Sequence, residues 1–114
     1  MISKNHRFHG YGSLRYVYRN GKTVRGPLCS LKYVYNPKRS SYRLAVVVSR
    51  KVHKSAVVRN RIRRRIYESA RRLEDRFLQP HDIVITVFHE NIATMPSEEL
   101  NKLIYAQLKQ AKII

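Results

Sequence analysis

Residues 49–72, SRKVHKSAVVRNRIRRRIYESARR, decide how the rest of the chain is interpreted. Eight of the sixteen residues from position 50 to position 65 are lysine or arginine, and none is acidic. If the segment is helical from Ala56, its apolar residues form one stripe, as in a helix that packs against a core. The stripe comprises Val58, Ile62, Ile66, Ala70, Leu73 and Phe77. The pattern therefore predicts an amphipathic helix, with Ser55 as its N-cap.

The arginines near the start of this helix lie where a helix least favours positive charge. The first turn carries roughly +0.5 of partial charge, so each cation there costs about 0.3–1 kcal/mol. Combined with the free amides of the helix start, Arg59 and Arg61 make a site suited to phosphates, and Asn60 adds an amide that both donates and accepts. A solvated helix face usually mixes charges of both signs, but this one has no acid before Glu68. We therefore predict a nucleic-acid contact, and we expect Arg59→Ala and Arg61→Ala to weaken it with little loss of folding stability.

The charge is unevenly distributed along the 114 residues, whose formal net charge is +17. Residues 1–67 contain 18 Lys or Arg and no acid, whereas residues 68–114 contain six against seven, so the two parts carry +18 and −1. This asymmetry predicts a polyanion-binding face whose affinity falls steeply with salt. There is no run of about 18 apolar residues, and residues 1–10 lack the apolar core of a signal peptide. With a single cysteine, Cys29, we expect a cytoplasmic protein without an internal disulfide or a membrane partner.

The first half of the chain predicts a short helix and two strands. We expect a flexible basic start over residues 1–12, with Lys4, Arg7 and Phe8 as its anchors. A helix over residues 13–20 follows, capped by Ser13 and stopped by Gly21. Strands are expected over residues 28–35 and 42–48, joined by a turn, with the second returning antiparallel. The apolar run in the second strand indicates a central strand covered on both faces.

After the arginine-rich helix, the pattern predicts another central strand over residues 82–88 and a final helix. The final helix begins with Glu98 and Glu99 and ends with Lys109 and Lys112, so it follows the dipole rule and is expected to serve the core. The order is helix, two strands with room for a third, helix, strand, helix. This predicts an α/β (α+β) two-layer sandwich in one domain spanning residues 1–114, with the arginine-rich helix in a crossover connection.

Residues 56–64, AVVRNRIRR, resemble the Arg-Asn-Arg signature helix of the bacterial ribonuclease P protein component. Residues 43–52, RLAVVVSRKV, are similar to the strand that leads into that helix, and residues 82–88 resemble the strand that follows it. The likeness covers nearly the whole chain. It implies the family's fold, in which the strand, helix, strand connection has a left-handed sense, whereas right-handed crossovers dominate in proteins.

The resemblance implies an RNA-binding subunit of an endoribonuclease. In the family the catalyst is an RNA that uses Mg²⁺ to release the mature 5′ end of tRNA, and the protein assists it. The implied partners are the ribonuclease P catalytic RNA and precursor tRNA, with no small-molecule substrate. Neutralising charge where the two RNAs meet would also lower the Mg²⁺ that cleavage needs. The implied contacts with the catalytic RNA are Arg50, Lys51, Lys54, Arg59, Asn60, Arg61, Arg63 and Arg64.

The resemblance also implies a cleft for the single-stranded 5′ leader between the first helix and the sheet. Two aromatics one turn apart usually face that cleft, and here the corresponding residues are Leu14 and Tyr18. An aliphatic side chain has therefore replaced one aromatic. Tyr33 is the expected contact from the sheet. Aromatics among cations can stack on unpaired bases, each stack contributing about 1–3 kcal/mol, while core packing is the alternative role for Tyr18.

The sequence offers no catalytic constellation of its own. The acids are scattered, the five histidines have no matching carboxylates, and there is no Gly-rich phosphate loop or zinc-ligand spacing. We therefore expect the protein alone to be non-catalytic and to hold no metal, with Mg²⁺ used by the RNA subunit. Three alternatives stay open: a ribosomal or other structural RNA-binding protein, a DNA-binding module with this helix in the major groove, and a nuclease acting alone.

Overall fold

The computed structural model describes residues 6–8 and 11–114. In this part of the chain, helices and short 3-10 turns surround one mixed sheet. In chain order the elements are α1 Tyr11–Asn20, β1 Lys22–Arg25, β2 Cys29–Tyr35, β3 Arg43–Val47, α2 Ala56–Arg71, η2 Glu74–Arg76, β4 His81–Val87, η3 Glu90–Ala93 and α3 Ser97–Gln110. The predicted helix and strand order is confirmed, and β1 takes the place of the optional strand.

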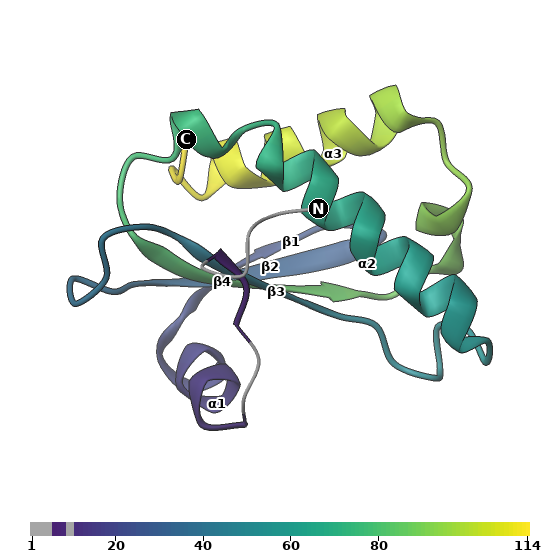
Figure 1. Ribbon diagram of the computed structural model, residues 1–114, viewed down its shortest axis with the longest axis horizontal. Helices are drawn as coiled ribbons and strands as arrows, with labels where there is room; N and C mark the ends of the chain where they lie inside the picture. The colour runs from purple at the N-terminus through teal and green to yellow at the C-terminus, as the bar shows by residue number, and fades with distance from the viewer. Residues whose placement is uncertain (1–5, 9–10) are drawn as a thin grey trace.

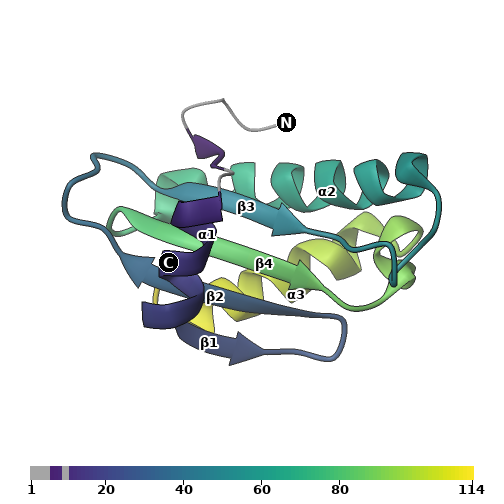
Figure 2. The same cartoon turned by 90° about the horizontal axis from the view of Figure 1, so that it is seen from below.

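The strand β4 is the centre of the sheet, whose order is β1-β2-β4-β3. It pairs antiparallel with β2, where Ile83 faces Tyr33, and parallel with β3, where Ile83 faces Leu44. The strands β1 and β2 form an antiparallel hairpin at one edge. Figure 2 shows β3 and β4 running side by side in the same direction. A parallel neighbour requires a crossover, and α2 provides it.

The sheet separates two unequal layers of helix. Figure 1 shows α2 and α3 on one face and α1 alone on the other. The helix α2 packs on β3 and α3 contacts β1, so the pair closes over the main core. On the opposite face Val17 of α1 is fully buried in a small cluster with Phe8, Ala45 and Val84. The predicted α+β sandwich is confirmed, and α1 adds a partial layer beyond the two that were expected.

The arginine-rich helix α2 forms as the sequence predicts. The backbone amide of Val58 donates to Ser55 Oγ at 3.4 Å, so Ser55 is the N-cap. The side chains of Ile62, Ile66 and Ala70 are almost completely buried in the main core. The helix ends at Arg71. Leu73 and Phe77, the last two residues of the predicted stripe, follow the helix and pack against the core from there. Burial of the stripe leaves the cationic positions outside.

The strand predicted over residues 42–48 forms, but the prediction of its place in the sheet was wrong. The strand β3 runs opposite to β2, as expected, but β4 lies between them, so β3 is not a central strand of the sheet. A short turn favours a hairpin, but two apolar runs compete for the centre here, and alternation does not tell which of them wins. Coverage of β3 on both faces is confirmed, because Leu44 and Val46 lie in the main core and Ala45 lies in the α1 cluster.

The connection from β3 through α2 to β4 is left-handed. In Figure 2 the sheet lies in front of α2, and the parallel strands β3 and β4 point the same way. Viewed instead from the α2 side with both strands pointing up, β4 lies to the left of β3. The uncommon handedness implied by the resemblance is therefore present.

The beginning of the chain differs from the prediction. The first helix starts at Tyr11, so Ser13 lies inside it and is not its cap, and the predicted flexible segment extends too far. Arg7 forms a parallel bridge with Leu44, and the Phe8 amide donates to the Leu44 carbonyl at 3.3 Å, which covers part of the free edge of β3. Lys4, the other predicted anchor, lies outside the described residues.

A largely buried ion pair ties β3 to β4 on the α1 face. Arg43 donates from Nε to Asp82 Oδ1 and from Nη2 to Asp82 Oδ2, both at 2.8 Å, and Asn36 donates to Asp82 Oδ2 at 3.0 Å. Burial alone would raise the pKa of Asp82, but the hydrogen bonds from Arg43 and Asn36 outweigh it and lower that pKa. The Arg43 guanidinium also lies 4.7 Å from the centre of the Phe8 ring. The ion pair therefore connects both strands to the segment that contains Phe8.

We predict that Asp82→Asn lowers the free energy of unfolding by about 3 kcal/mol at neutral pH, because it leaves Arg43 buried without its counter-charge. The pKa of Asp82 is lower in the folded state, so its stabilisation is complete above about pH 4 and disappears as the pH falls through that lowered value. Urea unfolding at several pH values should show the gap between wild type and variant closing in acid. Asp75→Asn, at an exposed position, is the matched control. A gap that stays constant between pH 7 and pH 2 would contradict the assignment.

Candidate nucleic-acid interface

The loop before α2 and the first turns of α2 carry an exposed cluster of cations. It is made of residues predicted to contact RNA, namely Arg50, Lys51, Lys54, Arg61 and Arg64. In the described part of the chain, no carboxylate forms an ion pair with any of these five. Their charges therefore face solvent without an internal counter-charge, as a polyanion-binding surface requires.

Two of the predicted RNA-contacting arginines use some of their hydrogen-bond donors within the protein. Arg59 donates to the carbonyl oxygens of His53 and Lys54, at 2.9 Å each, and so holds the basic loop against the start of α2. Arg63 donates to Asn60 Oδ1 at 2.6 Å and to the Val48 carbonyl at 3.4 Å. The expectation that loss of Arg59 leaves folding unaffected is therefore revised, because these bonds shape the loop. It stands for Arg61, which is exposed.

Arg65 connects α2 to the segment between β4 and α3. Its guanidinium donates to the Ile92 carbonyl at 2.6 Å and also to the Met95 carbonyl. These acceptors belong to η3 and to the turn that leads into α3. Arg65 was not among the predicted RNA contacts, and its geometry gives it a structural role.

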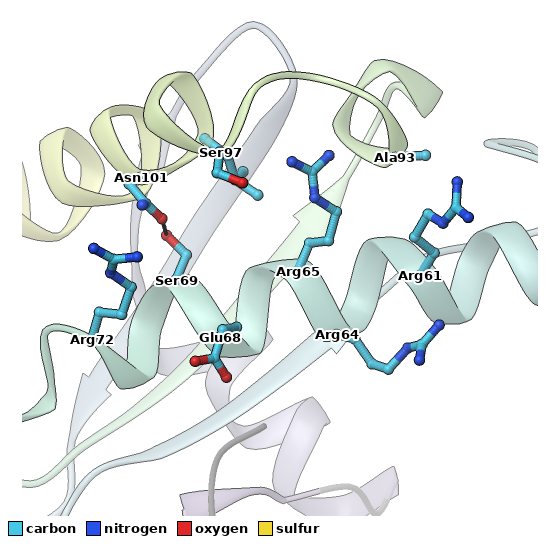
Figure 3. Close-up of a pocket in the computed structure, with 10 residues that line it drawn as sticks. Arg61, Arg64, Arg65, Glu68, Ser69, Arg72, Ala93, Ser97 and Asn101 are labelled. Carbon is cyan, nitrogen blue, oxygen red and sulfur yellow. Dashed lines mark hydrogen bonds between the residues drawn. The ribbon is translucent and has the colours of Figure 1, made fainter.

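The flank of α2 that faces α3 continues the cationic surface beyond the predicted residues. Figure 3 shows Arg61, Arg65 and Arg72 along this flank, whereas Arg64 and Glu68 point away from α3. Glu68 is paired with Arg71, whose hydrogen bond lowers the pKa of Glu68 to about 2. The predicted RNA contacts ended at Arg64 and did not include Arg72, although the helical period already puts Arg72 in line with Arg61 and Arg65.

The face of the sheet that carries α1 is the second candidate surface. Tyr18 and Leu14 lie one turn apart on α1, with Tyr18 exposed and Leu14 partly buried against the small cluster under the helix. Lys32 of β2 donates to the Tyr18 carbonyl at 3.0 Å, and its ammonium lies 5.9 Å from the centre of the Tyr18 ring. The two positions expected to line the leader cleft therefore lie on the face of the sheet that carries α1, and Lys32 adds a positive charge beside Tyr18.

The side chain of Tyr33 does not lie on the same face of the sheet as Leu14 and Tyr18. Side chains alternate along β2, and Tyr33 packs on the main core under α2 and α3, with its ring 5.8 Å from the His81 ring. Its side chain is therefore on the opposite face of the sheet from α1, and the expected leader contact is corrected. The register partners Ser30 and Thr86 alternate with core residues and point to the α1 face instead. Because side chains alternate along a strand, the sequence could have shown that Tyr33 and Ser30 lie on opposite faces, but not which of these faces carries α1.

Neither a clustered metal site nor a membrane span is found in the part of the chain that the structure describes. Across residues 6–8 and 11–114, no three His, Cys, Asp or Glu side chains gather where they could hold a metal ion. Among the same residues, no helix has both the length and the apolar character needed to cross a bilayer.

Comparison with known proteins places the chain in a family. The family model for Ribonuclease P matches residues 2–112. The chain belongs to the ribonuclease P protein family. The ribonuclease P protein component of Pseudanabaena sp. is 31% identical over 115 residues, which covers 100% of this chain and 97% of that protein. The ribonuclease P protein component of Chloroflexus aurantiacus is 36% identical over 100 residues, which covers 88% of this chain and 73% of that protein.

The fold agrees with that membership. The solved structure of a mutant RNase P protein from Staphylococcus aureus matches with a TM-score of 0.86 at 23% identity, and the match covers 97% of this chain and 92% of that one. At this identity the likeness concerns the fold. The resemblance stated from residues 43–52, 56–64 and 82–88 is confirmed. Membership of the ribonuclease P family favours that role over a ribosomal protein or a DNA-binding module.

We predict that Arg65→Ala destabilises the protein by roughly 2 kcal/mol, because the Ile92 and Met95 carbonyls lose a charged donor. Arg64→Ala is the matched control: it removes the same side chain one position earlier, where it is exposed, and should change the free energy of unfolding by less than about 0.5 kcal/mol. Thermal or urea unfolding of both variants measures the difference. Equal effects of the two substitutions would show that Arg65 does not anchor η3.

Proposed function

We propose that this chain, as a ribonuclease P protein, binds the catalytic RNA through α2 and the 5′ leader of precursor tRNA through the α1 face. In this proposal the RNA performs the Mg²⁺-dependent cleavage and the protein is a non-catalytic subunit. The observation that carries the proposal is the exposed cluster of five cations on α2 and its preceding loop, which has no internal carboxylate partner in the described part of the chain.

The geometry of α2 suits a folded polynucleotide better than a single small anion. The exposed cations are spread over the loop and successive turns of the helix, so several phosphates can be contacted at once. Bonds from Arg59 and Arg63 to backbone carbonyls fix the loop and helix start, and Asn60 remains exposed beside them. A preorganised cationic surface loses little conformational entropy when the RNA binds.

The α1 face has the features of a surface for unpaired nucleotides. It combines the exposed ring of Tyr18, the ammonium of Lys32, and the hydroxyls of Ser30 and Thr86 on the neighbouring strands. An aromatic ring can stack on a base while a cation holds the backbone. Because Leu14 is partly buried against the cluster under α1, we assign it to the apolar wall and assign stacking to Tyr18.

We assign Mg²⁺ to the RNA subunit. The protein's contribution is to reduce the repulsion between catalytic RNA and precursor tRNA by supplying positive charge on both faces of the sheet, so that less Mg²⁺ is needed. The single cysteine, Cys29, is buried and forms no disulfide, as suits the cytoplasm in which we propose that the complex works.

Cleavage of precursor tRNA by a bacterial ribonuclease P RNA, measured with and without this chain across a Mg²⁺ titration, tests the proposal. We expect the chain to restore cleavage at Mg²⁺ concentrations where the RNA alone is inactive, and we expect the protein alone to cut nothing. Arg61→Ala should require more protein for the same rate, while its melting temperature stays close to that of the wild type. If the chain leaves the Mg²⁺ requirement of the RNA unchanged, the proposed function is wrong.

The leader contact makes a separate prediction. Tyr18→Ala should weaken binding of precursor tRNA by roughly tenfold, corresponding to one lost base stack, and should leave binding of mature tRNA, which has no leader, unchanged. Tyr16→Ala, on the same helix and also exposed, is the control. Binding to the assembled complex is measured with both RNAs. Equal losses for precursor and mature tRNA would place Tyr18 outside the leader contact.

A further inference from the structure

A groove runs between α2 and α3 on the face of the molecule opposite α1. Its first part has a volume of about 530 Å³ and is lined by residues of α2, η3 and the first turns of α3. Its second part, of about 500 Å³, shares Ser69, Arg72 and Asn101 with the first and continues along the two helices to Arg76 and Tyr105. The two parts therefore form one groove, and Figure 3 shows the residues that line its first part.

The side chains along this groove are strongly cationic. Arg61 and Arg72 are exposed on the α2 wall, and Lys102 is exposed on the α3 wall. Within the described residues, neither Arg61 nor Arg72 forms an ion pair. The acid that borders the groove, Glu68, is paired with Arg71 and points away from α3. The groove is thus a positive channel without an internal counter-charge.

The groove is also held rigidly. The buried Ser69 hydroxyl donates to Asn101 Oδ1 at 2.8 Å and so joins α2 to α3 across its floor. Arg65 holds η3 through the Ile92 and Met95 carbonyls, and the Arg76 guanidinium lies 5.9 Å from the centre of the Tyr105 ring. The two walls therefore keep their separation without a ligand.

We infer that the α2–α3 groove holds a stretch of the sugar-phosphate backbone of the catalytic RNA, with Arg72 and Lys102 as phosphate contacts from opposite walls. This inference rests on the proposed function and deepens it, because it extends the RNA-binding surface from the start of α2 to its end and adds α3. Arg61 and Arg72 are eleven positions apart, so the α2 wall between them is about 16 Å long at 1.5 Å per residue, and more than one phosphate fits along it.

The character of the walls favours a nucleic-acid backbone over other occupants. An amphipathic peptide helix would need a continuous apolar strip. The groove has apolar lining residues at both ends, but they are separated in its middle by the three polar residues that its two parts share, Ser69, Arg72 and Asn101. Arginine and lysine side chains on two walls suit phosphates spaced along a strand. The groove also shares Arg61 with the cation cluster at the start of α2, so one RNA can follow both surfaces without a break.

The test measures how the affinity for a bacterial ribonuclease P RNA depends on salt for four full-length variants. Arg72→Gln and Lys102→Gln remove one groove charge each, Lys54→Gln removes one charge from the loop, and Lys109→Gln removes one exposed charge from α3 outside the groove. We expect Arg72→Gln and Lys102→Gln each to reduce the slope of log affinity against log salt by about one. At 0.15 M salt each should weaken binding about four- to sixfold. Lys109→Gln should match the wild type.

The outcomes separate this inference from the proposed function. If Lys54→Gln weakens binding but Arg72→Gln and Lys102→Gln behave like Lys109→Gln, the groove assignment is overturned and the proposed function stands. If the wild-type chain does not bind the RNA at all, both the proposed function and the groove assignment are wrong. Melting temperatures of all four variants exclude loss of folding as the cause.

A position-specific measurement complements the salt series. A hydroxyl-radical source attached through Lys102→Cys should cut the bound RNA at one short run of nucleotides, whereas the same source attached through Lys109→Cys should cut it weakly or not at all. The native Cys29 does not interfere, because it is fully buried and burial raises its pKa to about 11. Equal cutting from both positions would contradict an RNA strand in the groove.

Discussion

Burial of one apolar stripe of α2 determines where every cation of that helix points. Ile62, Ile66 and Ala70 are almost completely excluded from solvent, so rotation of the helix about its axis would expose them. With the stripe fixed, Arg61 and Arg72 must lie on the flank toward α3, and Arg64 must lie on the outer side. The placement of these three exposed charges therefore follows from hydrophobic packing.

The central position of β4 gives the protein two separate surfaces. Because β4 pairs with both β2 and β3, the crossover helix lies on one face and α1 is left on the other. The tie between Arg43 and Asp82 secures the β3–β4 pair on the α1 face, while Arg65 secures η3 on the opposite face. A catalytic RNA and a leader can thus be contacted on opposite faces of one rigid sheet. We regard this separation as the structural basis of the proposed division of contacts.

Arginine serves two purposes in α2, and composition does not distinguish them. Arg59, Arg63 and Arg65 donate to backbone carbonyls and hold the loop and η3 in place, whereas Arg61 and Arg72 extend into solvent. A guanidinium has five donors in a planar fork, so it can cross-link carbonyls as readily as it can bind phosphates. The same residue type therefore builds the scaffold and supplies the proposed RNA contacts.

The sequence by itself determined the local features: the amphipathic helix with its Ser55 cap, the strands, the polyanion-binding character and the family resemblance. These depend on neighbouring residues, through the helical and strand periods and through charge density. Only the tertiary structure decided that β4 lies between β2 and β3, that Tyr33 faces away from α1, and that α3 forms the second wall of a basic groove. Each of these depends on which distant segments pair. Two apolar runs, at residues 44–48 and 83–87, could each form the central strand, so that choice is left to the packing of the whole chain.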